Sequence, residues 1–450
     1  MSIPSNCTVL IIGGGPGGSY TASVLAREGI DSVLLEAERF PRYHIGESML
    51  PSLRYFLRFI GLDGEFDGRG FTEKVGAAFK VAPEIPEGFF DFLAVGPNNY
   101  SWNLLRSEAD SMLFAHASKS GAKAIDGVRV IDIQFDPAPG SGDIGRPVSA
   151  FYKCKGDDGS INTGTIRFDY LVDATGRAGL LSTKYLKSRV YSKALKNIAH
   201  WAYYTGAGMY APGTKRENSP FFEGFGDGSG WAWFIPLHDG TASVGIVRNQ
   251  EIFFQERKAP RVENGTDLAT YYEKALSTAP VITGLLHQTA SGSPAQRVSQ
   301  IHSASDYSYS STSYSLPYAR IVGDAGCFID PLFSSGFHLA LVGGLAAATT
   351  IAASIRGNVS EDVAAQWHSR KITASYTRFL LVVLAVYKQI RNQREVVLRA
   401  EVNISRPPAS SSPADGDLDR ALEVLRPGML PHFLLCFEIY ASSQNMVPYG

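Results

Sequence analysis

The stretch CTVLIIGGGPGGSYTASVLAREGIDSVLLEAE, residues 7–38, decides the fold. An apolar β run at Thr8–Ile12 leads into a glycine-rich loop, a helical pattern follows through Arg27, and a second strand occupies Ser32–Leu35. Glu36 closes that strand. The order strand, glycine loop, helix, strand and acid is typical of a βαβ unit that binds a dinucleotide, with the acid placed to bind a ribose. We therefore predict an α/β fold built around a dinucleotide site.

The glycine loop carries the phosphate-binding part of this prediction, through Gly13, Gly14, Gly15, Gly17 and Gly18. In this spacing Gly13 permits the tight turn, Gly15 lets the backbone approach a pyrophosphate, and Gly18 lets the helix pack on the strand. A helix N-terminus presents free N–H groups and a partial positive charge. We therefore expect the amides around Gly14 and Gly17 to face the phosphates.

The composition excludes several other classes of protein. The chain has 450 residues, of which 44% are hydrophobic and 19% charged, and a net charge of -1, so no nucleic-acid or membrane partner is indicated. The four cysteines are scattered, which favours a reducing compartment, and the early first strand leaves no room for a signal peptide. A cytoplasmic location is expected.

The longest apolar run, 379–387, is about half of the roughly 20 residues that a membrane span needs. The nine histidines form no convincing metal site.

Two later segments distinguish FAD from a nicotinamide dinucleotide. They are FDYLVDATGRAGLLS, residues 168–182, and YARIVGDAGCFIDPLFSSGFHLALVGGLAAA, residues 318–348. A strand-end acid followed by a helix N-terminus suits a sugar-like chain and an electron-rich ring edge. The whole pattern resembles the FAD-binding fold of the p-hydroxybenzoate hydroxylase class. That resemblance implies that Asp324 binds the ribityl chain and Arg106 the flavin; taken alone, Arg106 could be a solvated surface arginine. Arg42, just after the ribose acid, is expected to be a surface or nucleotide contact rather than a catalyst.

The segment DATG, residues 173–176, stands where hydroxylases of this class carry an Asp-Gly segment that serves both FAD and NADPH. The sequence also has no second G-x-G-x-x-G unit followed by its own helix and acid. We therefore expect the chain to bind FAD but little or no nicotinamide. Its flavin would arrive already reduced by a separate NAD(P)H-dependent flavin reductase.

Four separated motifs narrow the class further. They are PRYHIGESMLPS at 41–52, FTEKVGAAFK at 71–80, WAWFIP at 231–236 and FIDPLFSSGFH at 328–338. In this order they resemble the flavin-side loop, the active-site lysine motif, the WxWxIP motif and the tunnel motif of flavin-dependent halogenases. The resemblance covers about residues 5–400, and it is strongest to fungal halogenases that chlorinate phenolic aromatic polyketides such as resorcylic lactones.

The resemblance assigns a role to Lys74. Reduced FAD, O2 and chloride would generate hypochlorous acid, which a tunnel guides to this lysine. The ammonium would polarise the oxidant, or the neutral amine would be chlorinated; both readings stay open. Arginine would not substitute, because it does not readily become neutral. An ordinary solvent-exposed lysine is the alternative.

The resemblance also implies the residues around the flavin. The backbone amides of Ser335 and Gly336 would hold chloride, or bromide, at a helix start, a geometry that suits anions. An N-cap serine is the plainer interpretation and is compatible with it. The remaining expected flavin contacts are Glu47, Ser48, Pro331, Phe337, Trp231 and Trp233.

Residues two apart on a strand share a face, so the two tryptophans would form one rigid apolar wall. The resemblance implies that this wall lies beside the flavin and keeps the substrate from reaching it directly. Their alternative role is packing of an ordinary sheet.

Phe333 marks a departure from the tryptophan halogenases, which carry a glutamate immediately before the serine pair. This chain offers no carboxylate there. A phenol, whose oxygen already activates the ring, fits that difference better than an indole. We assign no substrate base, and we expect His338 to be a packing residue or to lie at the flavin edge.

The expected architecture is an FAD-binding Rossmann-like domain with an inserted β-sheet substrate domain and a helical C-terminal region. The FAD-binding domain is expected at 1–80, 100–195 and 300–355, the substrate domain at 81–99 and 196–299, and the helical region at 356–450 with a flexible segment at 405–417. Two alternatives to a halogenase remain: an FAD-dependent aromatic hydroxylase, and a flavoprotein without turnover. A carrier-tethered phenol also remains possible in place of a free one.

Overall fold

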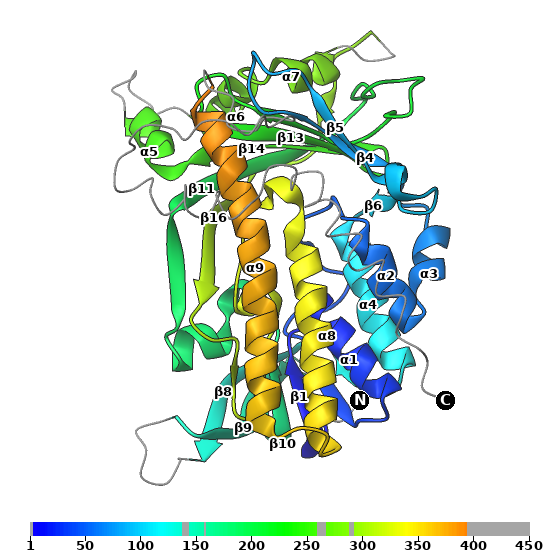
Figure 1. Ribbon diagram of the computed structural model, residues 1–450, viewed down its shortest axis with the longest axis vertical. Coiled ribbons are helices and arrows are strands. Elements are labelled where there is room, and N and C mark those ends of the chain that lie inside the picture. The colour runs from blue at the N-terminus through cyan, green and yellow to red at the C-terminus, as the bar shows by residue number, and fades with distance from the viewer. Residues whose placement is uncertain (1–2, 137–143, 157–158, 259–266, 288–291, 394–450) are drawn as a thin grey trace, which may run out of the picture.

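In the computed structural model two large β-sheets lie at opposite ends of the molecule, and long strands and two long helices join them (Figure 1). The structure describes residues 3–136, 144–156, 159–258, 267–287 and 292–393. The predicted flexible segment at 405–417 lies outside the described residues.

The first sheet contains the βαβ unit. Its order is β17-β18-β10-β1-β2-β7, with β9 pairing β10 and β8 pairing β9. The four pairings from β18 through β7 are parallel, as a βαβ arrangement requires. The strands are β1 (Asn6–Ile12), β2 (Ser32–Leu35), β7 (Lys123–Ile125), β8 (Val128–Asp136), β9 (Arg146–Lys155), β10 (Ile161–Asp173), β17 (Ser315–Leu316) and β18 (Ala319–Ile321).

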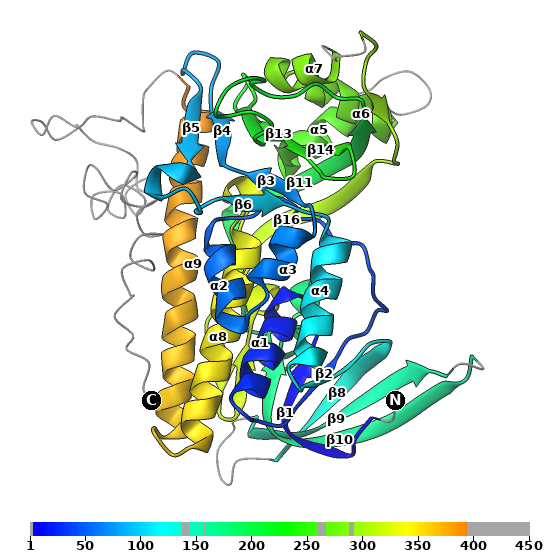
Figure 2. The ribbon, with the colours of Figure 1, turned by 90° about the vertical axis from the view of Figure 1, so that its right-hand side faces the viewer.

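Both faces of this sheet are covered, as expected for parallel strands. Val9 and Ile11 of β1 pack in a core with the helices, whereas Leu10 and Ile12 pack with β8–β10 on the other face. The helical layer lies between the two sheets (Figure 2). Its members are α1 (Pro16–Arg27), α2 (Ser52–Ile60), α3 (Asp63–Gly68), α4 (Arg106–Lys119) and α8 (Ser335–Ile355).

The second sheet has the order β15-β11-β14-β13-β12-β4-β5, with β16 pairing β11. Its strands are β4 (Gly76–Lys80), β5 (Gly88–Asp91), β11 (Arg189–Thr205), β12 (Phe221–Gly224), β13 (Gly230–Pro236), β14 (Thr241–Asn249), β15 (Gln296–Arg297) and β16 (His302–Ser311). One face carries α5 (Gln250–Lys258), α6 (Leu268–Leu276) and α7 (Pro280–His287). A separate small sheet pairs β3 (Thr72–Lys74) with β6 (Ser101–Asn103).

Period-two alternation in β13 divides the side chains of WAWFIP between two cores. Trp231, Trp233 and Ile235 join the core shared with the helical layer, whereas Ala232 and Phe234 join the core under α6 and α7. The tryptophans therefore share the face that looks toward the nucleotide-binding domain.

The second sheet extends beyond the boundaries predicted for the inserted domain. It recruits β4, which we had placed before residue 80, and β16, which we had placed after residue 300. β4 pairs with β12 and β16 with β11, and each of these partners lies more than 90 residues away in the sequence. Sequence alternation alone does not reveal such pairings.

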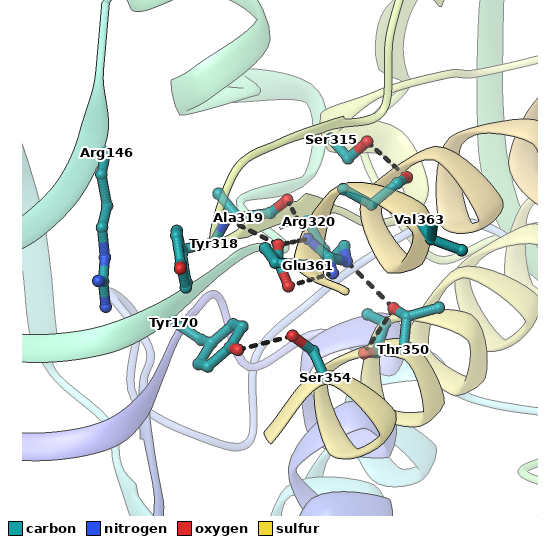
Figure 3. A network of polar contacts seen from close by, with 12 residues as sticks. Arg146, Tyr170, Ser315, Tyr318, Ala319, Arg320, Thr350, Ser354, Glu361 and Val363 are labelled. Carbon is teal, nitrogen blue, oxygen red and sulfur yellow. Dashed lines mark hydrogen bonds and ion pairs between the residues drawn. The ribbon is translucent and has the colours of Figure 1, made fainter. Parts of the chain in front are cut away.

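The helix α9 (Glu361–Arg391) runs beside α8 along the molecule and contains the apolar run 379–387 (Figures 1 and 2). Its start is fixed by Arg320, which is fully buried. The guanidinium donates to both carboxylate oxygens of Glu361, at 2.7 and 3.1 Å, and to Thr350 Oγ1 of α8 at 3.0 Å (Figure 3). A buried bidentate pair of this kind holds both helices to β18.

By length and apolar composition α8 could cross a membrane, but 61% of its most apolar window is buried in the fold. Residues such as Leu341, Ala347 and Ile351 are fully buried against neighbouring elements. We therefore describe α8 as a core helix.

Candidate active site

A cavity of about 580 Å³ opens at the glycine loop and extends along the start of α8 toward the second sheet. Most of the residues predicted for the site line it, and they come from segments far apart in the sequence. They are Gly13, Gly15, Gly17, Glu36, Arg42, Ser48, Arg106, Trp233, Asp324, Pro331, Gly336 and Phe337. The other predicted residues lie behind this lining: Gly14, Gly18, Glu47, Lys74, Trp231 and Ser335.

Close packing explains two of the loop glycines. Gly13 has φ 106°, and a Cβ there would lie 2.2 Å from the carbonyl oxygen of Ala174. A Cβ on Gly18 would lie 1.9 Å from the carbonyl oxygen of Gly13. Gly18 thus allows α1 to approach the turn after β1, which is the packing role predicted from its spacing.

Gly14 differs from its prediction. Its amide donates to Glu36 Oε2 at 2.6 Å, and Glu36 Oε1 accepts from the amide of Glu38 at 2.9 Å. The expectation that the Gly14 amide faces a phosphate is therefore wrong here. The reason is that β1 and β2 are adjacent, so the acid at the end of β2 reaches the loop at the end of β1.

The two arginines of the cavity share one carboxylate that the sequence analysis missed. Asp110, fully buried in α4, accepts two hydrogen bonds from Arg106, at 2.8 and 3.0 Å, and one from Arg42 at 3.1 Å. Arg106 also donates to the carbonyl oxygen of Ile45 at 2.8 Å and lies 5.2 Å above the ring of Phe337. Asp110 therefore fixes the direction of both cations. Its spacing of four residues from Arg106 was the available signal.

Asp324 also lines the cavity, in a 3-10 turn at Gly323–Ala325. Burial raises the pKa of its carboxyl, and the charges of Arg177, Arg106 and Arg189 oppose that rise. The phenol of Tyr309 donates to its backbone oxygen at 2.6 Å and holds the turn. An acid surrounded by three cations is suited to accept hydrogen bonds from a polyhydroxyl chain.

The loop before α8 forms a compact turn that presents the helix N-terminus to the cavity. A 3-10 turn at Pro331–Phe333 ends at Ser334, which has φ 55°, and α8 begins at Ser335. The Ser335 hydroxyl is fully buried and has no hydrogen-bond partner among the described residues. A buried donor without a partner is costly, so this position fits a bound acceptor such as an anion.

Lys74, the last residue of β3, lies one side chain behind the cavity wall. It is 1% exposed, and its Nζ donates to Ser48 Oγ at 2.8 Å and to the carbonyl oxygen of Met49 at 2.9 Å. The Phe92 ring lies 5.1 Å from the Nζ. Burial lowers the pKa of the amine from 10.5 to about 7. Ser48 lines the cavity and thus connects it with the lysine.

Glu47 precedes Ser48 in the chain but does not itself line the cavity. Its Oε1 accepts from the phenol of Tyr203 at 2.5 Å, and that phenol lies 3.0 Å from the Tyr43 hydroxyl. Burial raises the pKa of the Glu47 carboxyl to about 7. No sequence pattern indicated Tyr203, because it lies 156 residues away on β11.

The two tryptophans of WAWFIP are not equivalent. Trp233 lines the cavity, as does Trp201 of β11, a residue that the sequence analysis missed; their ring centroids are 6.4 Å apart. Trp231 is 1% exposed, does not line the cavity, and donates through Nε1 to the Tyr387 hydroxyl at 2.9 Å. Of these two indoles, whose ring centroids are 5.8 Å apart, Trp233 alone reaches the cavity, because Trp231 is covered by α9.

Phe333 and His338 occupy apolar surroundings next to the loop. The Phe333 ring stacks on Phe79 with centroids 5.4 Å apart. His338 Nδ1 lies 2.8 Å from Ser52 Oγ, and burial lowers its pKa to about 4. His338 is thus a neutral packing residue between α8 and α2, one of the two roles expected for it.

The parallel βαβ sheet, the arginine pair and the strand-end acid define an FAD-binding fold of the p-hydroxybenzoate hydroxylase class. The family model for tryptophan halogenase matches residues 8–92 and 93–396. The chain belongs to this family, and it is a flavin-dependent halogenase.

Individual comparisons agree with this assignment. The flavin-dependent halogenase ascD of Acremonium egyptiacum is 55% identical over 434 residues, which cover 95% of this chain and 74% of that protein. The sulochrin halogenase gedL of Aspergillus terreus is 53% identical over 410 residues, covering 88% and 72%. The crystal structure of CmlS, a flavin-dependent halogenase, superposes with a TM-score of 0.75 at 26% identity, covering 94% of this chain and 71% of that one. The hydroxylase alternative is therefore not favoured.

Proposed function

We propose that this halogenase chlorinates the ring of an electron-rich phenol, with chloride held at Ser335 and Gly336 and Lys74 as its catalytic residue. The observation that carries the proposal is the buried Lys74 amine, held 2.8 Å from the Ser48 hydroxyl that lines the cavity. An amine whose hydrogen bonds within the described residues go to a hydroxyl and a carbonyl oxygen, and whose pKa is near 7, is typical of a functional rather than a structural lysine.

The residues of the cavity fit FAD. The helix N-terminus after Gly15 would take the pyrophosphate, Glu36 a ribose, and Asp324 the ribityl chain. Arg106 and Phe337 would border the ring, because the guanidinium already lies over the phenyl group. When bound and reduced, FAD would supply two electrons and two protons, so that O2, chloride and one further proton yield hypochlorous acid and water.

The unpartnered Ser335 hydroxyl supports the halide assignment. Together with the first amides of α8 it offers several donors at a site where the helix dipole is positive. Chloride is the expected halide, and bromide would fit the same donors.

Lys74 would act at the step that follows. With a pKa of about 7, both protonation states are well populated at neutral pH. The ammonium can donate a hydrogen bond to hypochlorous acid and polarise its O–Cl bond, and the neutral amine can accept chlorine as a chloramine. In the first case a ring carbon takes chlorine from hypochlorous acid, and the displaced ring proton leaves with the hydroxide oxygen as water. In the second case water leaves when the amine is chlorinated; a ring carbon then takes the chlorine from the nitrogen, and the displaced ring proton restores the amine.

The substrate is proposed to bind between Lys74 and the second sheet, as a free phenolic natural product. The rings of Phe79, Phe222 and Phe333 form a stacked aromatic surface there, with neighbouring centroids at 4.8 and 5.4 Å. The relative gedL is named for sulochrin. We propose a separate NAD(P)H-dependent flavin reductase as the source of reduced FAD, and a cytoplasmic location for both proteins.

A mass-spectrometric assay tests the proposal. The protein is incubated with FAD, a flavin reductase, NADH, chloride and a panel of resorcinol-type phenols that includes sulochrin. We expect a product with the chlorine isotope pattern, lost in Lys74→Ala while FAD still binds, and kept in the control Lys80→Ala, which changes a lysine of β4. A product that gains one oxygen independently of chloride, equally in all three proteins, would refute it.

A further inference from the structure

A buried polar network joins Trp231 to the loop that precedes α8. The Tyr387 hydroxyl of α9 is its centre: it accepts from Trp231 Nε1 at 2.9 Å and from Asn197 Nδ2 at 2.8 Å, and it donates to Asp330 Oδ2 at 2.6 Å. Asn197 Nδ2 also donates to that carboxylate oxygen, at 3.0 Å. All four residues are at most 4% exposed. A tyrosine hydroxyl has one donor and two acceptor positions, so this one is saturated.

The other side of Asp330 sets the geometry of the loop. Its Oδ1 accepts from the amide of Leu332 at 3.1 Å, and its own amide donates to Ser308 Oγ at 2.9 Å. Leu332 lies in the 3-10 turn that ends at Ser334 and passes directly into α8. The place of the Asp330 carboxylate therefore determines where the first amides of α8 and the Ser335 hydroxyl point.

We propose that Trp231 and Tyr387 are positioning residues for the halide site. Through Asp330 they hold the turn at residues 331–334 in the conformation that directs the α8 N-terminus toward chloride. The inference rests on the proposed function, because it takes chloride as the ligand of Ser335 and Gly336. It separates the two tryptophans of the motif: Trp233 borders the cavity, whereas Trp231 acts on the loop from behind.

The contacts set the order of the expected effects. Tyr387→Phe removes a hydrogen bond to a buried carboxylate, so we expect the halide dissociation constant to rise about tenfold. Trp231→Phe keeps one aromatic ring in the site but removes the N–H donor to Tyr387 together with part of the buried indole, so about threefold is expected. Once Tyr387→Phe has removed the hydroxyl that accepts from Trp231, the N–H donor of Trp231 has no acceptor in the network. The double variant should therefore have the same halide affinity as Tyr387→Phe alone.

The experiment titrates FAD-loaded protein with sodium chloride and, separately, sodium bromide at constant ionic strength, following the absorbance of bound oxidised FAD. The FAD dissociation constant is measured in parallel. The control is Tyr170→Phe, which likewise removes a buried tyrosine hydroxyl. That hydroxyl lies 2.9 Å from Ser354 Oγ, near the end of α8 that is opposite to Ser335 (Figure 3). The two ends of α8 are about 30 Å apart.

Weakened halide binding in the three network variants, with unchanged FAD affinity and an unchanged control, is the expected result. Wild-type halide affinity in Trp231→Phe, or an equal loss of FAD and halide affinity, would overturn the inference, and Trp231→Phe decides the matter if Tyr387→Phe does not fold. A wild-type protein that neither responds to halide nor chlorinates any phenol would overturn the proposed function and this inference with it. The two failures are thereby distinguishable.

Discussion

Replacing Lys74 with methionine should make the protein more stable at neutral pH while abolishing chlorination. Burial lowers the pKa of the amine from 10.5 to about 7. Between these values the unfolded chain binds a proton at this position that the folded chain does not. The stability of the wild type therefore rises with pH across this window and is lowest below it.

The magnitude follows from that shift. This one group contributes a slope of about 1.4 kcal/mol per pH unit, which amounts to about 5 kcal/mol over the whole window. The variant also loses the hydrogen bonds to Ser48 Oγ and the Met49 carbonyl oxygen, together about 2 kcal/mol. We therefore expect Lys74→Met to be more stable than the wild type by about 2 kcal/mol at pH 7. The difference should fall to zero at about pH 9, where the remaining cost of the buried amine equals the contribution of its hydrogen bonds.

Urea unfolding of FAD-saturated protein at several pH values between 7 and 10 measures the difference. Other titrating groups are common to both proteins and cancel. Lys119→Met, which removes an amine whose side chain is 64% exposed, is the control. A difference between Lys74→Met and the wild type that stays constant from pH 7 to 10 would refute the argument, because it would mean that the buried amine keeps an ordinary pKa.

Three further predictions test the cavity. Asp110→Asn should raise the FAD dissociation constant about tenfold, measured by quenching of FAD fluorescence, because a buried carboxylate that orients two arginines is lost; unchanged affinity would contradict this role. Gly18→Ala should prevent stable folding or lower the midpoint of thermal unfolding strongly, since its Cβ would lie 1.9 Å from the Gly13 carbonyl oxygen, whereas Gly64→Ala, with nothing within 4 Å, should not. Ser335→Ala should raise the KM for chloride without lowering the thermal midpoint, because the hydroxyl has no partner to lose; a lower midpoint at unchanged KM would show that the hydroxyl serves the fold.

Much of the fold was predictable because its signals are local. The βαβ unit lies within about thirty residues, and its glycines, strand periodicity and closing acid are all visible in one segment. The alternation in WAWFIP predicted correctly that Trp231 and Trp233 share a face. It did not predict that α9 covers one of them, because Tyr387, the residue of α9 that contacts Trp231, lies 156 residues further along the chain.

The amino-acid sequence by itself determined the class of this protein. Four short motifs indicate that class by their order and spacing, which can be recognised without knowing any contact in the folded chain. The tertiary structure decided what the motif residues do. Burial, which no local pattern encodes, brings the pKa of Lys74 near neutrality, and the pairing of β1 with β2 gives the Gly14 amide to Glu36. Asn197 of β11, Trp231 of β13 and Tyr387 of α9 meet in one buried network that ends at Asp330, although they are far apart in the sequence. Electrostatics and hydrogen bonding depend on distances through space, and only the packed chain fixes those distances.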